Sequence, residues 1–125
     1  MKEVKFYYCQ DGDKLVYMLN EGTGKMSCCG EPMSLLHPGT IDTMEDKHIP
    51  QISREAGMVH VVIGKEKHPM TEERYIAFIA AVQGDRVQFV HLHPGDEPKA
   101  SFHAEEGPVQ VYGFCNLHGL WRTEA

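Results

Sequence analysis

The sequence predicts an all-β protein built as a sandwich of roughly seven strands. Twelve glycines and seven prolines are spread along the 125 residues and divide the chain into short segments. Many of these segments are rich in Val, Ile, Phe and Tyr, which are residue types that favour strands. Strand-length segments that recur at this spacing, with turn residues between them, are typical of an all-β sandwich.

Residues 1–36 are predicted to form a small, cysteine-bearing β-hairpin module. Its strand candidates are 6–9 and 14–19, and the glycine-containing segment 20–24 separates them from Cys28 and Cys29. Two or three short strands cannot bury a core of their own. Such a unit therefore needs either a bound metal ion or a larger neighbour to stabilise it.

Residues 37–125 are predicted to form the sandwich itself. The run 74–82 is apolar on both alternating faces, which indicates a strand buried on both sides. Just before it, Thr71 and two glutamates look like a helix N-cap with an acidic first turn, so we expect a short helical turn there. The other strands of this domain are expected at 58–64, 86–92, 100–104 and 109–114.

Composition excludes several classes of partner. The formal charge is −6 and there is no basic block, which argues against nucleic acid, because phosphate binding needs clustered Lys and Arg. We find no apolar run of about 18 residues and no signal-peptide core, so we expect no membrane insertion and a cytoplasmic protein. In that compartment the four cysteines are expected to be ligands or redox thiols rather than disulfides.

The strongest candidate for a functional site is the pair Cys115 and His118, three positions apart. The pair lies where the alternating strand 109–114 gives way to a glycine-containing turn. At such an exit two side chains can converge on one point, and backbone N–H groups of the turn can donate to the sulfur. Taken alone, the spacing is weak evidence for a metal site and is more typical of a buried thiol beside a surface histidine.

Two further histidines stand before turns, His48 in a Lys-His-Ile-Pro segment and His68 in His-Pro-Met. Together with the Cys-Asn-Leu-His segment and the N-terminal Cys-Cys-Gly-Glu-Pro-Met, these motifs closely resemble desulfoferrodoxin, the two-centre form of superoxide reductase. The resemblance covers nearly the whole chain. It implies an immunoglobulin-like β-sandwich that holds one mononuclear, non-haem iron through four imidazoles in a plane and one axial thiolate.

The resemblance assigns four ligands to positions of this chain, His48, His68, His118 and the axial Cys115. The position of the fourth imidazole, six residues after His68, is Arg74. A guanidinium stays protonated and will not bind iron. His60 or His103 could replace the missing imidazole, or water could fill the gap. Zn²⁺ is a possible substitute for iron, although it prefers a tetrahedral set of ligands.

The resemblance also gives Lys47 a catalytic role, because the family has a loop lysine that attracts superoxide toward the iron. Asp46 stands where the family usually has glutamate, whose longer side chain can reach the open site. Without the resemblance, these are two solvated charges of a loop.

The N-terminal centre departs from the family pattern as well. The desulforedoxin-like module of the family uses four thiolates, and Gly12 occupies the position of one of them. Asp11 or Asp13 could supply an oxygen ligand; otherwise the module is metal-free or only loosely metallated. The three thiols that remain for this second, degenerate site are Cys9, Cys28 and Cys29.

Three functions follow from these observations. The first is superoxide reductase, which transfers one electron to superoxide and gives hydrogen peroxide; the resemblance implies a small donor such as rubredoxin and a homodimer. The second is a metal-binding or electron-transfer relative whose reductase activity is weakened or lost because Arg74 replaces a histidine. The third is a structural relative with both centres empty.

Overall fold

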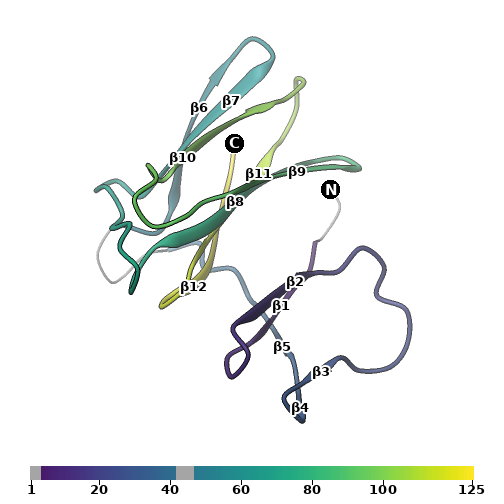
Figure 1. Ribbon diagram of the computed structural model, residues 1–125. Coiled ribbons are helices and arrows are strands. Elements are labelled where there is room, and N and C mark those ends of the chain that lie inside the picture. The colour runs from purple at the N-terminus through teal and green to yellow at the C-terminus, as the bar shows by residue number, and fades with distance from the viewer. Residues whose placement is uncertain (1–3, 42–46) are drawn as a thin grey trace. The chain divides into compact units, whose positions relative to one another are not determined.

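The computed structural model describes residues 4–41 and 47–125 of the chain (Figure 1). The chain divides into two compact units, a smaller one that ends at His37 and a larger one that begins at Pro38. We call them the hairpin unit and the sandwich unit. The described residues form strands that pair antiparallel and contain no helix, which confirms the all-β prediction. None of the described residues therefore belongs to a helix able to span a membrane.

The sandwich unit contains two antiparallel sheets. One sheet has the strand order β10-β7-β6 and the other has the order β12-β11-β8-β9. The described residues of this unit form seven strands, which agrees with the predicted number, although the first and last of these strands were not predicted. Their bounds are β6 (Pro50–Glu55), β7 (Met58–Ile63), β8 (Ile76–Gln83), β9 (Arg86–His91), β10 (Lys99–His103), β11 (Gln110–Cys115) and β12 (Gly119–Glu124).

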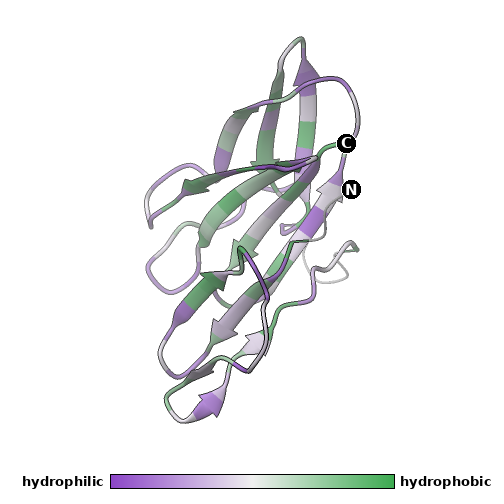
Figure 2. Cartoon of the chain, turned by 90° about the vertical axis from the view of Figure 1, so that its right-hand side faces the viewer, coloured by the Kyte–Doolittle hydropathy of each residue, from purple (hydrophilic) through white to green (hydrophobic). Residues whose placement is uncertain are grey.

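The core of the sandwich unit lies between its two sheets. On β7 alternate residues point inward, and Val59, Val61 and Ile63 are buried to 1% exposure or less. They pack with buried residues of the other sheet, among them Ile79 of β8 and Val111 of β11. Figure 2 shows hydrophobic residues along the strands of this unit and hydrophilic ones in many of its loops. Cys115 belongs to the same buried cluster, so its thiol lies at the border of the core.

The helical turn expected at Thr71 is wrong. The Thr71 hydroxyl does accept the backbone N–H of Arg74 at 3.1 Å, as an N-cap would. However, the Arg74 carbonyl turns back and accepts the Thr71 N–H at 2.9 Å, which closes the loop. The chain then enters β8 directly. This tight loop fixes the backbone of Arg74 next to the start of a core strand.

The hairpin unit is made of short strands around its cysteines. Strand β1 pairs with both β2 and β5, and β3 pairs with β4. The β1–β2 pairing ends at Cys9 opposite Lys14, so the tight turn between them carries Gly12. The bounds are β1 (Phe6–Cys9), β2 (Lys14–Tyr17), β3 (Ser27–Cys28), β4 (Glu31–Pro32) and β5 (Ser34–Leu35).

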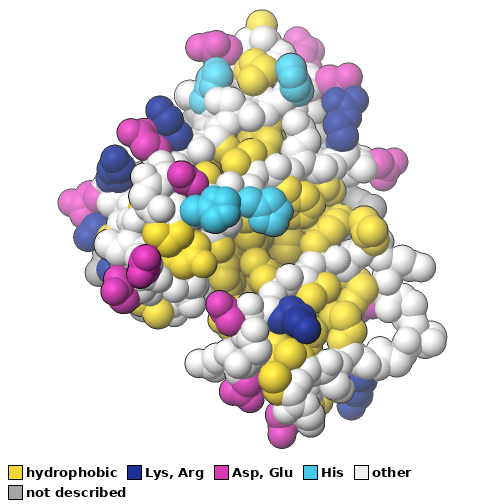
Figure 3. All heavy atoms as spheres, viewed as in Figure 1, with side chains coloured by type: hydrophobic (Ala, Val, Ile, Leu, Met, Phe, Trp, Pro, Cys, Tyr) yellow, Lys and Arg dark blue, Asp and Glu magenta, His cyan; other side chains and the backbone are white. Residues whose placement is uncertain are grey.

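Charged side chains are mixed on the face drawn in Figure 3, where Lys and Arg are scattered among Asp and Glu. That distribution is in keeping with the formal charge of −6. Over the described part of this face the basic side chains form no continuous patch.

Candidate metal centre

Cys115 and His118 occupy the two ends of the turn between β11 and β12. The pairing of β11 with β8 shifts register between Phe114 and Cys115, which is a bulge at the last residue of the strand. Bulges re-aim side chains next to functional sites. Gly119, with φ +86°, then reverses the chain in a conformation that suits glycine. Cys115 is fully buried and His118 is half-buried, so the turn presents both side chains to one region.

His48 is placed by contact of its segment with the end of β7. The Gly64 N–H donates to the carbonyl of Ile49 at 3.0 Å. The His48 side chain is fully buried. Its ring stacks on the ring of Trp121, with centroids 4.7 Å apart and an interplanar angle of 14°. A buried imidazole held between a strand end and an indole has little rotamer freedom, which favours ligand preorganisation.

The structure brings His48, Cys115 and His118 together. The His48 Nε2 and His118 Nδ1 atoms are 3.1 Å apart. The Cys115 Sγ lies 4.0 Å from the same His118 Nδ1. All three ligand atoms lie within 4.8 Å of one another, so a single metal ion could contact them together. Two imidazole nitrogens and a thiol form a donor set that suits iron or zinc.

His68 borders this group, with its ring centroid 5.2 Å from that of His48. Its Nδ1 lies 2.6 Å from the carbonyl oxygen of Pro69, and because a carbonyl can only accept, Nδ1 carries the proton. The opposite nitrogen, Nε2, is buried and has no hydrogen-bond partner. Burial lowers the pKa of His68 to about 4, with smaller contributions from His48 and Arg74. The ring is therefore neutral at physiological pH, with its lone pair on Nε2.

The buried Nε2 of His68 has the properties of a metal ligand. A buried ring nitrogen with no hydrogen-bond partner costs about 1–3 kcal/mol, and a bond to a metal would supply the missing interaction. His68 already has the tautomer that a ligating histidine needs, with the other nitrogen donating to a carbonyl. The group of His48, Cys115 and His118 therefore has donors that suit iron or zinc, and His68, at its border, offers one further imidazole nitrogen.

Arg74, at the position where the fourth imidazole was expected, lies close enough to His68 for its charge to lower the pKa of that histidine. The two alternative histidines do not join the group among the described residues. His60 Nδ1 is 2.7 Å from the Ser101 hydroxyl on the neighbouring strand. His103 lies on the exposed side of β10. Neither supplies the missing imidazole in this structure.

Asn116 connects the Arg74 loop to the ligand turn, a role that the sequence reading had missed. Its side-chain oxygen accepts the Tyr75 N–H at 2.9 Å, and its side-chain nitrogen donates to the Glu73 carbonyl at 3.0 Å. Its own N–H donates to the Tyr75 carbonyl at 3.2 Å. A turn asparagine commonly bonds backbone groups close to it in the chain, whereas these partners lie 41 and 43 residues away, so no local pattern indicated this role.

Trp121 is a buried core residue that also orders the ligand segments. Besides stacking on His48, its indole N–H donates to the carbonyl of His118 at 3.1 Å. One side chain therefore holds both segments that carry the clustered imidazoles. Lys47 directly precedes His48 and is half-buried. Asp46 lies outside the described residues.

The three thiols of the hairpin unit also come together. The sulfurs of Cys9, Cys28 and Cys29 all lie within 4.8 Å of one another. Hydrogen bonds from Cys28 and from the Gly12 N–H lower the pKa of Cys9. The same bond with Cys9, together with burial, raises the pKa of Cys28 to about 12. Of Cys9 and Cys28, the anionic form is therefore better stabilised at Cys9.

Neither aspartate that was considered as a fourth ligand joins these thiols among the described residues. The Asp13 carboxylate instead accepts the Tyr8 hydroxyl at 2.9 Å.

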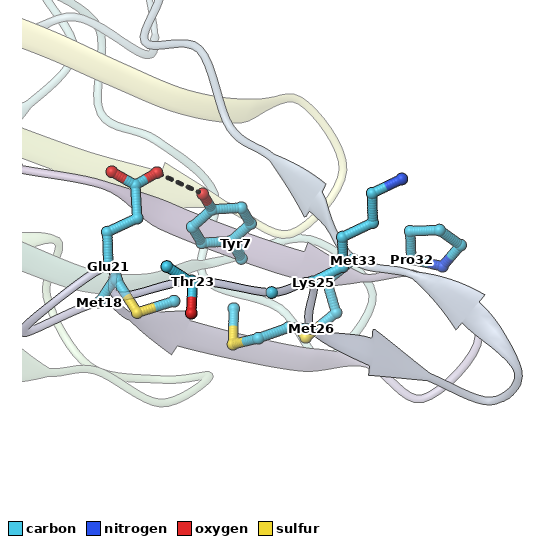
Figure 4. A pocket seen from close by; sticks show the side chains of 9 residues that line it. Tyr7, Met18, Glu21, Thr23, Lys25, Met26, Pro32 and Met33 are labelled. Carbon is cyan, nitrogen blue, oxygen red and sulfur yellow. Dashed lines mark hydrogen bonds between the residues drawn. The ribbon is translucent and has the colours of Figure 1, made fainter.

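A pocket of about 460 Å³ lies elsewhere in the hairpin unit (Figure 4). Its carboxylate, Glu21, accepts the ammonium of Lys5 at 2.8 Å and the hydroxyl of Tyr7 at 3.4 Å. The contact with Lys5 also lowers the pKa of Glu21. The rest of the lining is largely apolar or thioether, including Met18 and Met33. The carboxylate of this pocket is therefore already paired, and Lys25 is the other charged residue of its lining.

A β-sandwich with imidazoles and a thiol gathered where one strand ends has the architecture of a metalloprotein with a histidine- and cysteine-bearing centre. Residues 40–124 match the family Desulfoferrodoxin, and residues 2–36 match Desulfoferrodoxin, N-terminal domain. The chain therefore belongs to the desulfoferrodoxin family.

Individual relatives cover almost the entire chain. It is 37% identical over 123 residues to desulfoferrodoxin of Syntrophotalea carbinolica, covering 98% of both proteins. It is 40% identical over 124 residues to the desulfoferrodoxin homolog of Archaeoglobus fulgidus, covering 98% of this chain and 99% of the relative. Its structure is similar to the crystal structure of the superoxide reductase from Treponema pallidum, with a TM-score of 0.82 and 28% identity over 98% of this chain and 99% of the other.

Proposed function

We propose that this protein is a mononuclear, non-haem iron superoxide reductase. The reaction is the transfer of one electron to superoxide, which takes up two protons and becomes hydrogen peroxide. The observation that carries the proposal is the buried Nε2 of His68, without a hydrogen-bond partner, beside the group of His48, Cys115 and His118. Membership of the desulfoferrodoxin family and likeness to a solved superoxide reductase support it.

In this proposal the four side chains hold the iron as three neutral imidazoles and one thiolate. Iron, when bound, supplies the electron that superoxide accepts. His68 is kept neutral by burial, and its Nδ1–H to Pro69 directs the Nε2 lone pair away from the backbone. Cys115 lies in the apolar core, so its sulfur is shielded from water and from adventitious oxidants. Trp121 keeps the imidazole of His48 in place.

Lys47 is proposed to attract the anionic substrate. It directly precedes His48, a proposed ligand, and is itself half-buried. Attraction by a nearby charge can raise association rates by about tenfold or more. The effect should decline with ionic strength, because salt screens charges over about 8–10 Å.

The reaction needs an external electron source, because each superoxide consumes one electron. We propose a small redox protein such as rubredoxin as the donor, and a homodimer as the working assembly, both from the family resemblance. A cytoplasmic location stays a prediction of the sequence.

A second function is favoured by one observation, the arginine beside His68. With Arg74 in place of a fourth imidazole, the centre has one ligand fewer and a cation nearby. Both changes are expected to alter iron affinity and reduction potential. The alternative is a metal-binding or electron-transfer protein in which reductase turnover is weakened or lost.

Reductase turnover of the iron-loaded chain would decide between these functions. Superoxide is generated enzymatically in the presence of reduced rubredoxin, and oxidation of the rubredoxin is followed optically. Superoxide reductase should oxidise one rubredoxin per hydrogen peroxide formed and release no dioxygen from superoxide. The Cys115→Ser variant should lose this activity. Equal rates for wild type and Cys115→Ser would reject the reductase and favour the alternative, provided that the wild type retains iron.

A further inference from the structure

The three thiols of the hairpin unit come from separate places in the chain and meet at one point. Cys9 ends β1, and Cys28 ends β3. Cys29 follows in the tight turn to β4 with φ +55°, a strained conformation for a residue with a side chain. The sulfurs of Cys28 and Cys29 are 3.7 Å apart, and all three lie within 4.8 Å of one another. Three thiolates about 2.3 Å from one metal ion would lie roughly 3.8–4.0 Å apart, so only small shifts are needed.

Gly12 marks the fourth side of this group. A Cβ built at Gly12 would lie 3.0 Å from the Cys28 sulfur and 3.4 Å from those of Cys29 and Cys9. The side chain that glycine lacks would therefore point into the middle of the three sulfurs. The Gly12 N–H already donates to the Cys9 sulfur at 3.3 Å. The backbone of Gly12 does not adopt the left-handed conformation that requires glycine, so an alanine is conformationally acceptable there.

No carboxylate or imidazole among the described residues completes the group as a fourth ligand. The site is also reachable from solvent, since Cys9 is buried but Cys28 is half-buried and Cys29 exposed. A four-thiolate iron centre therefore does not fit this chain. Three thiolates with one side accessible resemble instead the arrangement of zinc sites that keep one position for an external ligand. Soft thiolates select thiophilic ions such as Zn²⁺ and Cu⁺.

We propose that Cys9, Cys28 and Cys29 bind one thiophilic d¹⁰ metal ion through three thiolates, with the fourth position, on the side of Gly12, taken by an exchangeable small thiolate. The external ligand binds without electron transfer: a thiol loses its proton to solvent, and its sulfur forms a bond to the metal in place of water. The site lies in the hairpin unit and does not depend on the reductase proposed for the sandwich unit.

Cadmium is a suitable probe, because the ¹¹³Cd NMR shift distinguishes three thiolate ligands from four. The reduced full-length chain, stripped of metal, is titrated with ¹¹³Cd²⁺. We expect one signal typical of three thiolates, retained in Cys115→Ser and lost in Cys28→Ser. Affinity for Cd²⁺ at this site should fall by more than about 100-fold in Cys28→Ser. Loss of a residue that only supports a ligand lowers metal affinity by about 10–100-fold, so a larger loss indicates that Cys28 binds the metal directly.

Exchange at the fourth position is tested by adding 2-mercaptoethanol. The wild-type signal should move to the four-thiolate range, whereas Gly12→Ala, with a methyl group directed at the sulfurs, should not respond. Gly12→Cys should give the four-thiolate signal without added thiol.

Two results would overturn the proposal. One is the absence of any cadmium signal that depends on Cys28. The other is a wild-type signal that 2-mercaptoethanol leaves unchanged, and this result needs no variant to fold. Reductase activity enters neither measurement, so failure here would leave the function proposed for the sandwich unit unaffected.

Discussion

Two glycines of the sandwich unit form a matched pair for testing how the His48 segment is held. Gly64 follows β7 with φ +86°, and a Cβ there would lie 2.4 Å from the carbonyl oxygens of both Lys47 and Glu66. Gly84 has φ +59°, and a Cβ there would meet nothing within 4 Å. Replacement by alanine therefore introduces the same kind of backbone strain at both positions, and a steric overlap at only one.

The left-handed conformation costs an alanine about 1–2 kcal/mol, so Gly84→Ala should lower the free energy of unfolding by about that amount. Gly64→Ala carries the same cost and must also displace two backbone carbonyls, which cannot rotate away as a side chain could. Overpacking of this kind adds about 1–3 kcal/mol. We expect a total loss of about 2–5 kcal/mol for Gly64→Ala. Because Lys47 directly precedes His48, its displacement should also weaken iron binding by about 10–100-fold.

Urea unfolding measures the first quantity. Trp121 is the only tryptophan of the chain and lies in the sandwich unit, so its fluorescence reports on that unit. Competition with a chelator measures iron affinity. If both variants lose the same free energy of unfolding, and both retain wild-type iron affinity, the contact between Gly64 and the Lys47 backbone is not what positions His48.

Three further predictions concern the centre and its surroundings. Arg74→His should strengthen iron retention by adding an imidazole, and the exposed Arg86→His should not; equal iron contents in wild type and Arg74→His would show that Arg74 is not at a ligand position. The pKa of His68 is lowered from 6.5 to about 4 in the folded chain, so the unfolded chain binds more protons between these values. In the metal-free protein, the neutral His68 ring should contribute fully to the free energy of unfolding above pH 6.5. This contribution should fall by about 3 kcal/mol on acidification to pH 4. The free energy of unfolding, measured by urea titration at several pH values, should depend less on pH in His68→Gln than in wild type. In the exposed His93→Gln its pH dependence should equal that of wild type. A pH dependence that is reduced in His93→Gln and retained in His68→Gln would show that the titrating group is not His68. Asn116→Ala leaves two backbone groups without partners and should cost about 1–3 kcal/mol in urea unfolding; a loss below about 0.5 kcal/mol would mean that the two loops are held together by other contacts.

Local patterns in the sequence predicted most of the fold. The strand before Cys115 was predictable because its alternating side chains and the glycine of the turn that follows are both local features of the sequence. Strand β6 was missed because its outer half, Ser53 to Glu55, is polar and exposed. The tight loop at Thr71 was read as a helical turn because an N-cap pattern does not show where the next carbonyl points. At both positions the same local pattern is compatible with two structures: a polar segment can be a loop or an exposed strand, and an N-cap pattern can begin a helix or close a tight loop.

The candidate site was predictable only where its residues lie in motifs. The indole of Trp121 stacks on an imidazole far away in the chain, and no local pattern indicates such a contact. The loss of a thiol at Gly12 was visible in the sequence. That a side chain there would point between three sulfurs depends on the geometry of the turn. Burial of the His68 Nε2 without a hydrogen-bond partner is likewise a property of the packed molecule.

The central claim is that His48, His68, His118 and Cys115 bind one iron together. Iron K-edge X-ray absorption of the full chain, loaded with one equivalent of ferrous iron, tests it most directly. We predict one sulfur scatterer, lost in Cys115→Ser, together with several imidazole nitrogens. A spectrum without sulfur, or a sulfur contribution that disappears in Cys28→Ser and persists in Cys115→Ser, would contradict the account.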